Sequence, residues 1–212
     1  MTDPYFFGYG SLVNLSTHIY SDPYAAEISG WRRTWKTTRD GKSALLSIRP
    51  SAEDVLFGLI ARVPNGDWRA LDEREIGYHR QDVTDVIFSE KFKPQICSVY
   101  IVSKPAERKK EANSPILLTY LDVVLQGFLQ IYGEQGPKDF FATTDSWDRP
   151  VLDDRSDPKY PRHQMLSKDE TAMVNDLQRL VETNLAKVRQ ELKATAGGKG
   201  WQQQIDRDKK RQ

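Results

Sequence analysis

Short apolar runs separated by glycine, proline, aspartate and serine fill the first half of the chain. Runs of this length that end in turn-forming residues predict β-strands. Beyond residue 102 the apolar positions recur every three or four residues, which is typical of amphipathic helices. A strand-rich half followed by a helical half predicts an α+β fold. The expected strands cover residues 5–9, 27–36, 44–49, 55–63, 83–88 and 96–102.

The helical pattern occurs in several stretches, and two of them carry clear start signals. Ser114 can cap a helix that has Pro115 at its first position, where a missing N–H costs nothing. Ser167 and Glu170 have the spacing of a capping box. The prolines between residues 148 and 162 predict a mostly irregular segment there. The expected helices cover residues 68–75, 114–133, 137–144 and 167–189.

The composition is that of an ordinary soluble protein, with 38% hydrophobic and 29% charged residues in a chain of 212. A formal net charge of +1 gives no basic footprint, so neither nucleic acid nor a membrane surface is an expected partner. The sequence contains no signal peptide and no membrane-spanning apolar run, which predicts a cytoplasmic protein. One cysteine and three scattered histidines predict neither a disulfide framework nor a metal site.

A glycine-rich loop follows the first expected strand. Gly8 and Gly10 flank Tyr9 and permit a backbone turn that leaves N–H groups without side-chain cover. Such N–H groups can hold a carboxylate or a developing oxyanion. The alternative is an ordinary tight turn, because short glycine motifs recur by chance. Gly10 directly precedes Ser11, so the loop lacks the Gly-x-Ser-x-Gly pattern of a serine nucleophile.

Glu75 closes the first expected helix on the same face as Trp68 and Leu71. A carboxylate among apolar groups resists ionisation, which raises its pKa toward the range useful to a general base. Asp72, three residues earlier, could add repulsion between like charges. The alternative is that Glu75 and its charged neighbours form a solvated helix face.

In combination these motifs resemble those of the γ-glutamylcyclotransferase superfamily. The loop at residues 9–12, Tyr-Gly-Ser-Leu, is similar to the family's signature loop after its first strand. Residues 74–78, Arg-Glu-Ile-Gly-Tyr, are similar to the segment that carries the family's catalytic glutamate. The details are closest to the ChaC-type, glutathione-specific branch, in which a Tyr-Leu-Asp sequence also occurs in a later helix, here at residues 120–122.

The resemblance implies a small mixed β-barrel with peripheral helices. We expect this domain at residues 1–135, a helical extension packed on it at residues 136–194, and a disordered tail at residues 195–212. The sequence leaves the oligomeric state open.

The implied activity is that of a γ-glutamylcyclotransferase, an enzyme of the acyltransferase or lyase type that needs no metal or organic cofactor. It would cyclise the γ-glutamyl group of glutathione, a γ-glutamyl amino acid or a γ-glutamyl amine, and release 5-oxoproline and the free amine. Glu75 is the expected catalytic acid–base residue. The residues expected to bind the substrate are Tyr9, Gly10, Ser11, Leu12 and Tyr78.

Other interpretations stay open on the sequence alone. The same fold could serve a non-catalytic ligand-binding or scaffold protein, although binding alone does not require a carboxylate that moves a proton. The helix at residues 167–189 could form an interaction surface. Residues 145–162, which lie outside the resemblance, could cover the pocket as a lid or pack the helical half onto the barrel.

Overall fold

The computed structural model describes residues 3–38, 41–83, 86–88, 94–103 and 114–197, with only the backbone described for residues 86–88 and 184–197. The chain divides into two compact units, Met1–Val174 and Asn175–Gln212. The described part of the second unit is the continuation of helix α4 (Lys168–Gly197). The domain boundary predicted after residue 135 stays a prediction, and most of the predicted tail lies outside the described residues.

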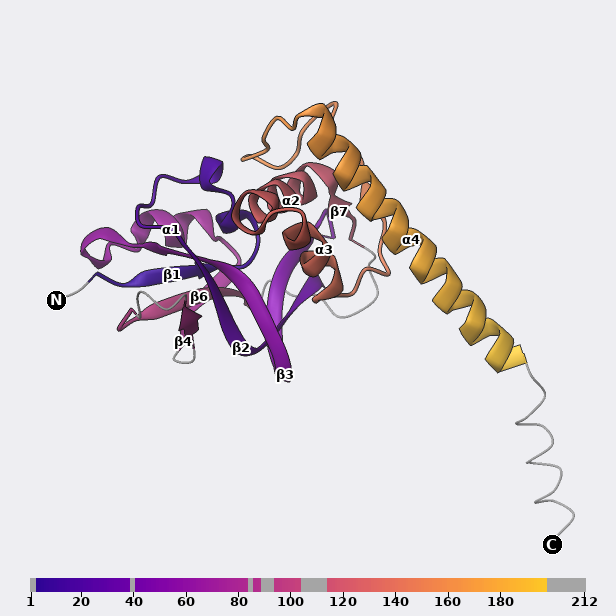
Figure 1. The fold of residues 1–212 in the computed structure, drawn as a ribbon, viewed down its shortest axis with the longest axis horizontal. Coiled ribbons are helices and arrows are strands. Elements are labelled where there is room, and N and C mark those ends of the chain that lie inside the picture. The colour runs from indigo at the N-terminus through magenta and orange to yellow at the C-terminus, as the bar shows by residue number, and fades with distance from the viewer. Residues whose placement is uncertain (1–2, 39–40, 84–85, 89–93, 104–113, 198–212) are drawn as a thin grey trace, which may run out of the picture. The chain divides into compact units, whose positions relative to one another are not determined.

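The first unit is built on a mixed β-sheet, so the predicted α+β class is confirmed (Figure 1). In the described residues the sheet contains the strands β1 (Tyr5–Gly8), β2 (Tyr24–Thr37), β3 (Ala44–Arg62), β4 (Tyr78–Val83), β5 (Val86–Phe88), β6 (Cys97–Val102) and β8 (Thr144–Asp145). Their order is β4-β6-β1-β3-β2-β5, with β8 also paired to β2. β1 is parallel to β6 and β8 is parallel to β2, whereas the other pairs are antiparallel.

The prediction of a closed barrel is wrong, because the sheet is open. Its edges are β4 and β5, and no ladder joins these two strands in the described part of the chain. β5 has only three residues, and these pair with β2.

The longest strands, β2 and β3, form a hairpin that bends in its middle. Gly30 adopts a φ of 83°, and the register of the ladder shifts between Ser29 and Trp31. A β-bulge of this kind bends a strand and increases its twist. The sequence predicted a break between strands at residues 50–54, where the structure has one continuous strand. The ladder is nevertheless interrupted there, because the pairing passes from Val55 opposite Ser29 to Pro50 opposite Trp31 and skips residues 51–54.

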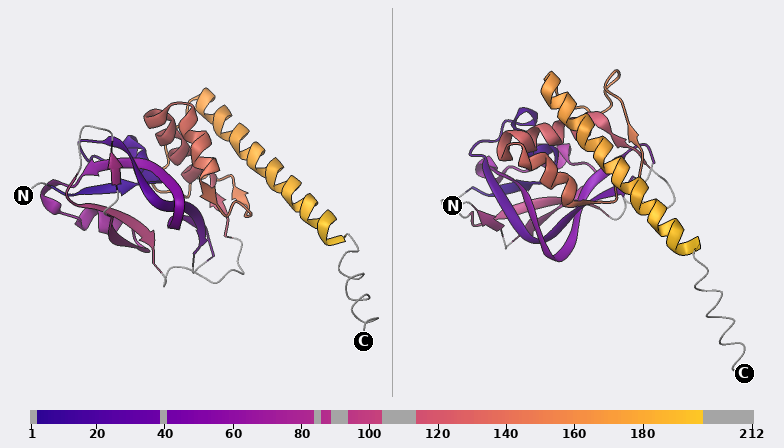
Figure 2. Two further views of the ribbon diagram at one scale, coloured as in Figure 1. Left: turned by 60° about the horizontal axis from the view of Figure 1, so that its bottom comes forward. Right: turned by 45° about the vertical axis from the view of Figure 1, so that its right-hand side comes forward.

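Helices α2 (Leu118–Tyr132) and α3 (Gln135–Ala142) lie together on one side of the sheet (Figures 1 and 2). The core lies between this helical layer and the sheet. Its fully buried side chains include Phe6 and Phe7 from β1, Leu59 from β3, and Leu121 and Phe128 from α2. This packing places the segment that follows β1 directly against α2.

Helix α2 begins three residues after the predicted position. Residues Ile116–Leu117 form strand β7, which pairs in parallel with β9 (Val151–Leu152). The side chain of Asp154 accepts a hydrogen bond of 2.9 Å from the backbone N–H of Thr119 in the first turn of α2. A side chain distant in the sequence thus satisfies an N–H group that the helix itself cannot pair. The predicted end at Gly133 is confirmed.

The predicted capping box at the start of α4 is confirmed. The backbone N–H of Ser167 donates to Glu170 Oε2 over 2.7 Å, and the N–H of Glu170 donates to Ser167 Oγ over 3.2 Å. In the part of the chain that the structure describes, no helix is both long and apolar enough to cross a membrane.

Candidate active site

The glycine-rich loop after β1 packs against neighbours that leave no room for side chains. A Cβ atom on Gly8 would lie 2.6 Å from Leu12 Cβ, and one on Gly10 would lie 2.6 Å from the Tyr120 hydroxyl. Residues Ser11–Val13 form a single 3-10 turn, η1. The first N–H groups of such a turn have no partner within it.

Helix α2 holds the far end of this loop. The side chain of Asn14 donates to the backbone carbonyl of Val123 and to Gln126 Oε1, both over 2.9 Å. A Cβ atom on Gly127 would lie 2.6 Å from the Asn14 backbone nitrogen, so glycine is required for this close approach. The loop therefore has a fixed position relative to α2.

Arg33 holds the near end of the loop from strand β2. Its guanidinium donates to the Tyr9 carbonyl over 2.8 Å and to Thr143 Oγ1 over 2.8 Å. It is fully buried and lies 4.8 Å and 5.1 Å from the ring centres of Phe128 and Phe140. Burial lowers the pKa of Arg33. This buried cation fixes the backbone of Tyr9 where the loop begins.

Glu75 lies at the C-terminal end of helix α1 (Arg69–Arg74), with its N–H bonded to the Leu71 carbonyl over 2.9 Å. Leu71 is fully buried, and the Glu75 side chain is only 15% exposed. Burial raises the pKa of Glu75, whereas the adjacent Arg74 guanidinium lowers it, and burial has the larger effect. The Glu75 side chain is therefore mostly buried and is not part of a solvated helix face.

Arg74 joins Glu75 to the loop region. Its Nε donates to Glu75 Oε1 over 3.0 Å. Its terminal nitrogens donate to the Thr17 carbonyl over 2.8 Å and to Ser11 Oγ over 3.3 Å. With a side chain only 7% exposed, Arg74 is held on several sides and in turn orients the Glu75 carboxylate.

The other acidic residues of α1 are not part of this arrangement. Asp72 accepts hydrogen bonds from Arg80 Nη1 over 2.7 Å and from the Tyr100 hydroxyl over 2.6 Å. It is therefore neutralised locally, and it is not among the causes of the raised pKa of Glu75. Glu73 is exposed to solvent.

The loop and Glu75 meet at a pocket with two parts. The inner recess has a volume of about 30 Å³, and all six predicted site residues line it. The outer pocket has a volume of about 290 Å³. The residues that line both parts are Ser11, Leu46, Glu75, Tyr78 and Tyr120. Because Glu75 is among these shared residues, it lies where the two parts adjoin.

Tyr78 contributes a hydroxyl whose oxygen can accept a further hydrogen bond. It donates to the Leu46 carbonyl over 2.9 Å, so its oxygen can still accept a hydrogen bond from a ligand. Burial raises the pKa of Tyr78 and keeps the hydroxyl protonated. Tyr9 differs from Tyr78 in its position. Its hydroxyl donates to the Tyr100 carbonyl, and the residue lines the inner recess but not the outer pocket.

The structure adds residues to which the sequence assigned no role. Tyr120 enters the sequence argument only as part of the Tyr-Leu-Asp sequence, and Arg33 does not enter it. The outer pocket also includes a wall from residues 159–162. No local motif marks that wall, since it depends on contacts between distant parts of the chain.

Other reactive side chains are in unfavourable settings for catalysis. Burial raises the pKa of the Cys97 thiol to about 12, so it stays protonated and is a poor nucleophile. Burial lowers the pKa of His18 to about 4, and its ring packs edge-on against Phe6 at 5.5 Å. Among the described residues, no group of three or more acidic, histidine or cysteine side chains is placed to hold a metal ion.

The pocket therefore places a buried carboxylate beside a turn whose backbone N–H groups could bind an anion. Glu75 provides a buried carboxylate with a raised pKa, which suits a general base. The backbone of the loop provides N–H groups that suit a carboxylate or an oxyanion. A substrate that brings its own nucleophile would find both functions within this pocket.

Comparison with known proteins gives one match to a protein family. A family model described as "ChaC-like protein" matches residues 4–115. This span contains both the glycine-rich loop and the segment around Glu75, whereas residues 120–122 and 145–162 lie beyond it. No curated protein sequence matches the chain.

Several solved structures share the fold. A γ-glutamyl cyclotransferase is 15% identical with a TM-score of 0.53, over 83% of this chain and 99% of its own. YkqA from Bacillus subtilis is 18% identical with a TM-score of 0.55, over 72% of this chain but only 57% of its own. An uncharacterised protein from Homo sapiens is 16% identical with a TM-score of 0.52, over 81% of this chain and 97% of its own. At these identities the likeness establishes the fold.

Proposed function

The chain belongs to the ChaC-like family, and on this basis we propose that it is a γ-glutamylcyclotransferase with Glu75 as its acid–base residue. The observation that carries the proposal is the burial of Glu75 with a raised pKa in the pocket lined by the glycine-rich loop. The match to the family spans both of these elements.

The proposed reaction needs no nucleophile from the protein. The α-amine of the γ-glutamyl group attacks its own γ-carbonyl carbon, and a new C–N bond closes a five-membered ring. The bond from the γ-carbon to the leaving nitrogen then breaks, which releases 5-oxoproline and the free amine. A pocket that holds the chain folded gives this cyclisation the advantage of proximity.

Glu75 supplies the proton transfers in this proposal. At neutral pH the α-amine of the substrate is protonated and cannot attack. The Glu75 carboxylate removes that proton before the attack and returns it to the leaving nitrogen as the tetrahedral intermediate collapses. The ring nitrogen gives up a second proton after the ring closes, which the carboxylate, free again, passes to solvent. Arg74 holds the carboxylate at 3.0 Å and lowers the pKa of Glu75 against the effect of burial.

The inner recess is proposed to take the α-carboxylate of the γ-glutamyl group. Its volume of about 30 Å³ suits a group of carboxylate size and is too small for the whole substrate. Its walls include Gly10, Ser11 and Leu12, whose backbone would supply N–H groups to the anion. Tyr78, with a hydroxyl that can still accept, would receive a hydrogen bond from the substrate's amine or amide.

The test is the release of 5-oxoproline from a panel of glutathione, γ-glutamyl-alanine and γ-glutamyl-lysine, measured by mass spectrometry. We expect 5-oxoproline from at least one of them in stoichiometric amount with the free amine. Binding of these compounds without any turnover would contradict the proposal and favour a ligand-binding protein on the same fold.

A further inference from the structure

One wall of the outer pocket comes from a segment far along the chain. Lys159, Tyr160, Pro161 and Arg162 line the pocket together with Ser11 and Glu75 of the family motifs. Residues 159–162 lie outside residues 4–115, the span that matches the family. What this wall recognises is therefore a property of this chain that the family match does not determine.

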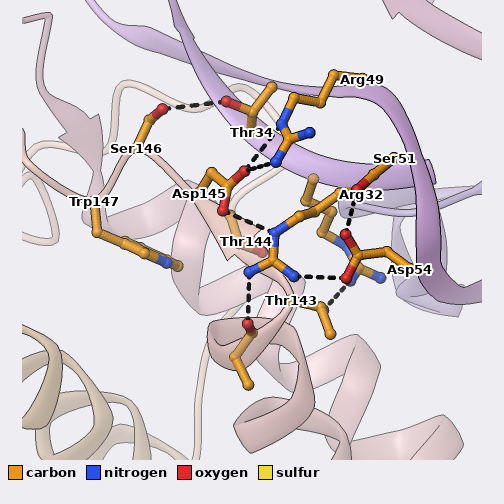
Figure 3. Close-up of polar contacts among 12 residues, drawn as sticks. Arg32, Thr34, Arg49, Ser51, Asp54, Thr143, Thr144, Asp145, Ser146 and Trp147 are labelled. Atoms are coloured by element: carbon orange, nitrogen blue, oxygen red, sulfur yellow. Dashed lines mark hydrogen bonds and ion pairs between the residues drawn. The ribbon is translucent and has the colours of Figure 1, made fainter.

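The segment that carries this wall, residues 145–162, is called the strap below. Its first residue is held by the sheet, because Asp145 accepts from Arg32 Nε over 2.8 Å and from Arg49 Nε over 3.0 Å (Figure 3). Its middle is held by α2, because Arg155 donates to both carboxylate oxygens of Asp122 over 2.8 Å and 2.6 Å. The Asp122 side chain is only 6% exposed.

Further contacts fix the strap next to the pocket. The buried Asp154 carboxylate accepts from Thr119 Oγ1 over 2.6 Å and from the backbone N–H of Lys159 over 2.9 Å. The ring of Tyr160 packs edge-on against that of Tyr120, with ring centres 5.0 Å apart. The strap therefore both lines the pocket and packs onto α2.

The charges around the outer pocket are unequal. Arg74, Lys159 and Arg162 line it, and among the described lining residues Glu75 is the only acid. Arg74 is paired with Glu75, and Lys159 is paired with Asp157 over 3.1 Å. No described residue forms a hydrogen bond or an ion pair with the Arg162 guanidinium, although its charge reaches Glu75 and lowers the pKa of that carboxyl.

The position of Glu75 between the inner recess and the outer pocket determines which part of a bound substrate would lie near Arg162. Arg162 lines the outer pocket and not the inner recess. If the α-carboxylate of the γ-glutamyl group fills the inner recess, the bond that breaks lies beside Glu75, where the two parts adjoin. The leaving amine then extends into the outer pocket, toward the strap.

We propose that Arg162 is a specificity-determining residue that binds a carboxylate on the leaving amine, so that γ-glutamyl amino acids and short γ-glutamyl peptides are preferred over γ-glutamyl amines. This inference rests on the proposed function. An arginine fork matches a carboxylate with two parallel hydrogen bonds. A leaving group with an ammonium instead would meet Arg162 and Lys159 with the same sign of charge.

The experiment compares γ-glutamyl-alanine with γ-glutamyl-alaninamide, which differ only in the carboxylate of the leaving group. We expect kcat/KM to be about tenfold or more higher for the acid, the size of effect typical of a charge-assisted hydrogen bond. In Arg162→Met the value for the acid falls by a similar factor, the value for the amide changes far less, and the preference approaches one. Arg162→Lys keeps part of the preference because it keeps the charge.

The exposed Arg69 provides the matched control, because Arg69→Gln removes a cation away from the pocket and leaves the preference as it is. Equal kcat/KM for the acid and the amide in the unmodified protein would overturn this inference alone. An equal loss on both substrates in Arg162→Met would also overturn it, because that is the result of a purely structural role. No turnover of either substrate or of glutathione would overturn both this inference and the proposed function.

Discussion

Arg74 Nε lies 3.0 Å from Glu75 Oε1, so these two sequence neighbours form an ion pair in the site. Burial raises the pKa of Glu75 from its ordinary value of 4.5, and the Arg74 guanidinium opposes that rise. The ionised carboxylate is the form that acts as a base. Activity should therefore fall as the pH falls through the raised pKa of Glu75.

This relationship predicts the effect of Arg74→Gln on the pH profile. Removal of the guanidinium removes the charge that lowers the Glu75 pKa, so the acidic limb of kcat/KM should move to higher pH. The free-enzyme pKa is the quantity that this limb reports. Arg69→Gln on the same helix should leave the limb in place, since Arg69 is 85% exposed and pairs with Asp67. A limb that moves to lower pH in Arg74→Gln would refute the assignment.

The contact between Gly10 and Tyr120 predicts a rescue. A Cβ on Gly10 would lie 2.6 Å from the Tyr120 hydroxyl and 3.0 Å from Leu46 Cδ2, so Gly10→Ala should displace the loop and lower kcat/KM by about tenfold or more. Tyr120→Phe makes space by removing the hydroxyl. The double variant Gly10→Ala/Tyr120→Phe should therefore be more active than Gly10→Ala alone. If adding Tyr120→Phe lowers activity further, the contact does not limit the loop.

Arg33 predicts a large loss of stability. Arg33→Met leaves the buried carbonyl group of Tyr9 and the partly buried one of Phe57 without their Arg33 donor, which should lower the free energy of unfolding by about 3 kcal/mol. Arg49, 44% exposed and paired with Asp145 on the same sheet, is the matched control (Figure 3). Its replacement by methionine should cost less than about 1 kcal/mol. Urea denaturation of both variants makes the comparison, and equal losses would contradict this account of Arg33.

The ion pair between Arg155 and Asp122 predicts non-additive effects. Arg155→Met leaves the buried Asp122 carboxylate uncompensated and should lower the free energy of unfolding by about 3 kcal/mol. The double variant Arg155→Met/Asp122→Asn removes the buried charge and should be more stable than Arg155→Met. Additive losses in a double-mutant cycle measured by urea denaturation would show that the pair does not hold the strap.

The elements that the sequence pattern predicts are those with strong local signals. Strand β1, the long hairpin, the Gly133 end of α2 and the capping box of α4 follow from apolar runs, glycine and cap residues. Strand β4 was missed because residues 78–83 are largely polar, and its pairing to β6 leaves most of its side chains exposed. The start of α2 was misplaced because Asp154, which caps it, lies far away in the sequence.

The residues of the candidate site likewise divide into those that a local motif predicts and those that it does not. Glu75 and the glycine-rich loop were found because each lies within a short motif, and the ChaC-like match confirms the family resemblance based on them. Arg33, Tyr120 and Arg162 reach the site through tertiary contacts. Their roles depend on which distant backbone or ring lies beside them, and no spacing in the sequence encodes that.

The most direct test of the central claim is 5-oxoproline release by the unmodified protein, Glu75→Gln and Glu73→Gln on a substrate that the panel identifies. Glu73 lies exposed on the same short helix, so Glu73→Gln controls for the loss of one negative charge. We predict that Glu75→Gln lowers kcat by about a hundredfold or more while Glu73→Gln keeps full activity. Full activity in a folded Glu75→Gln protein would contradict the assignment of Glu75 as the acid–base residue.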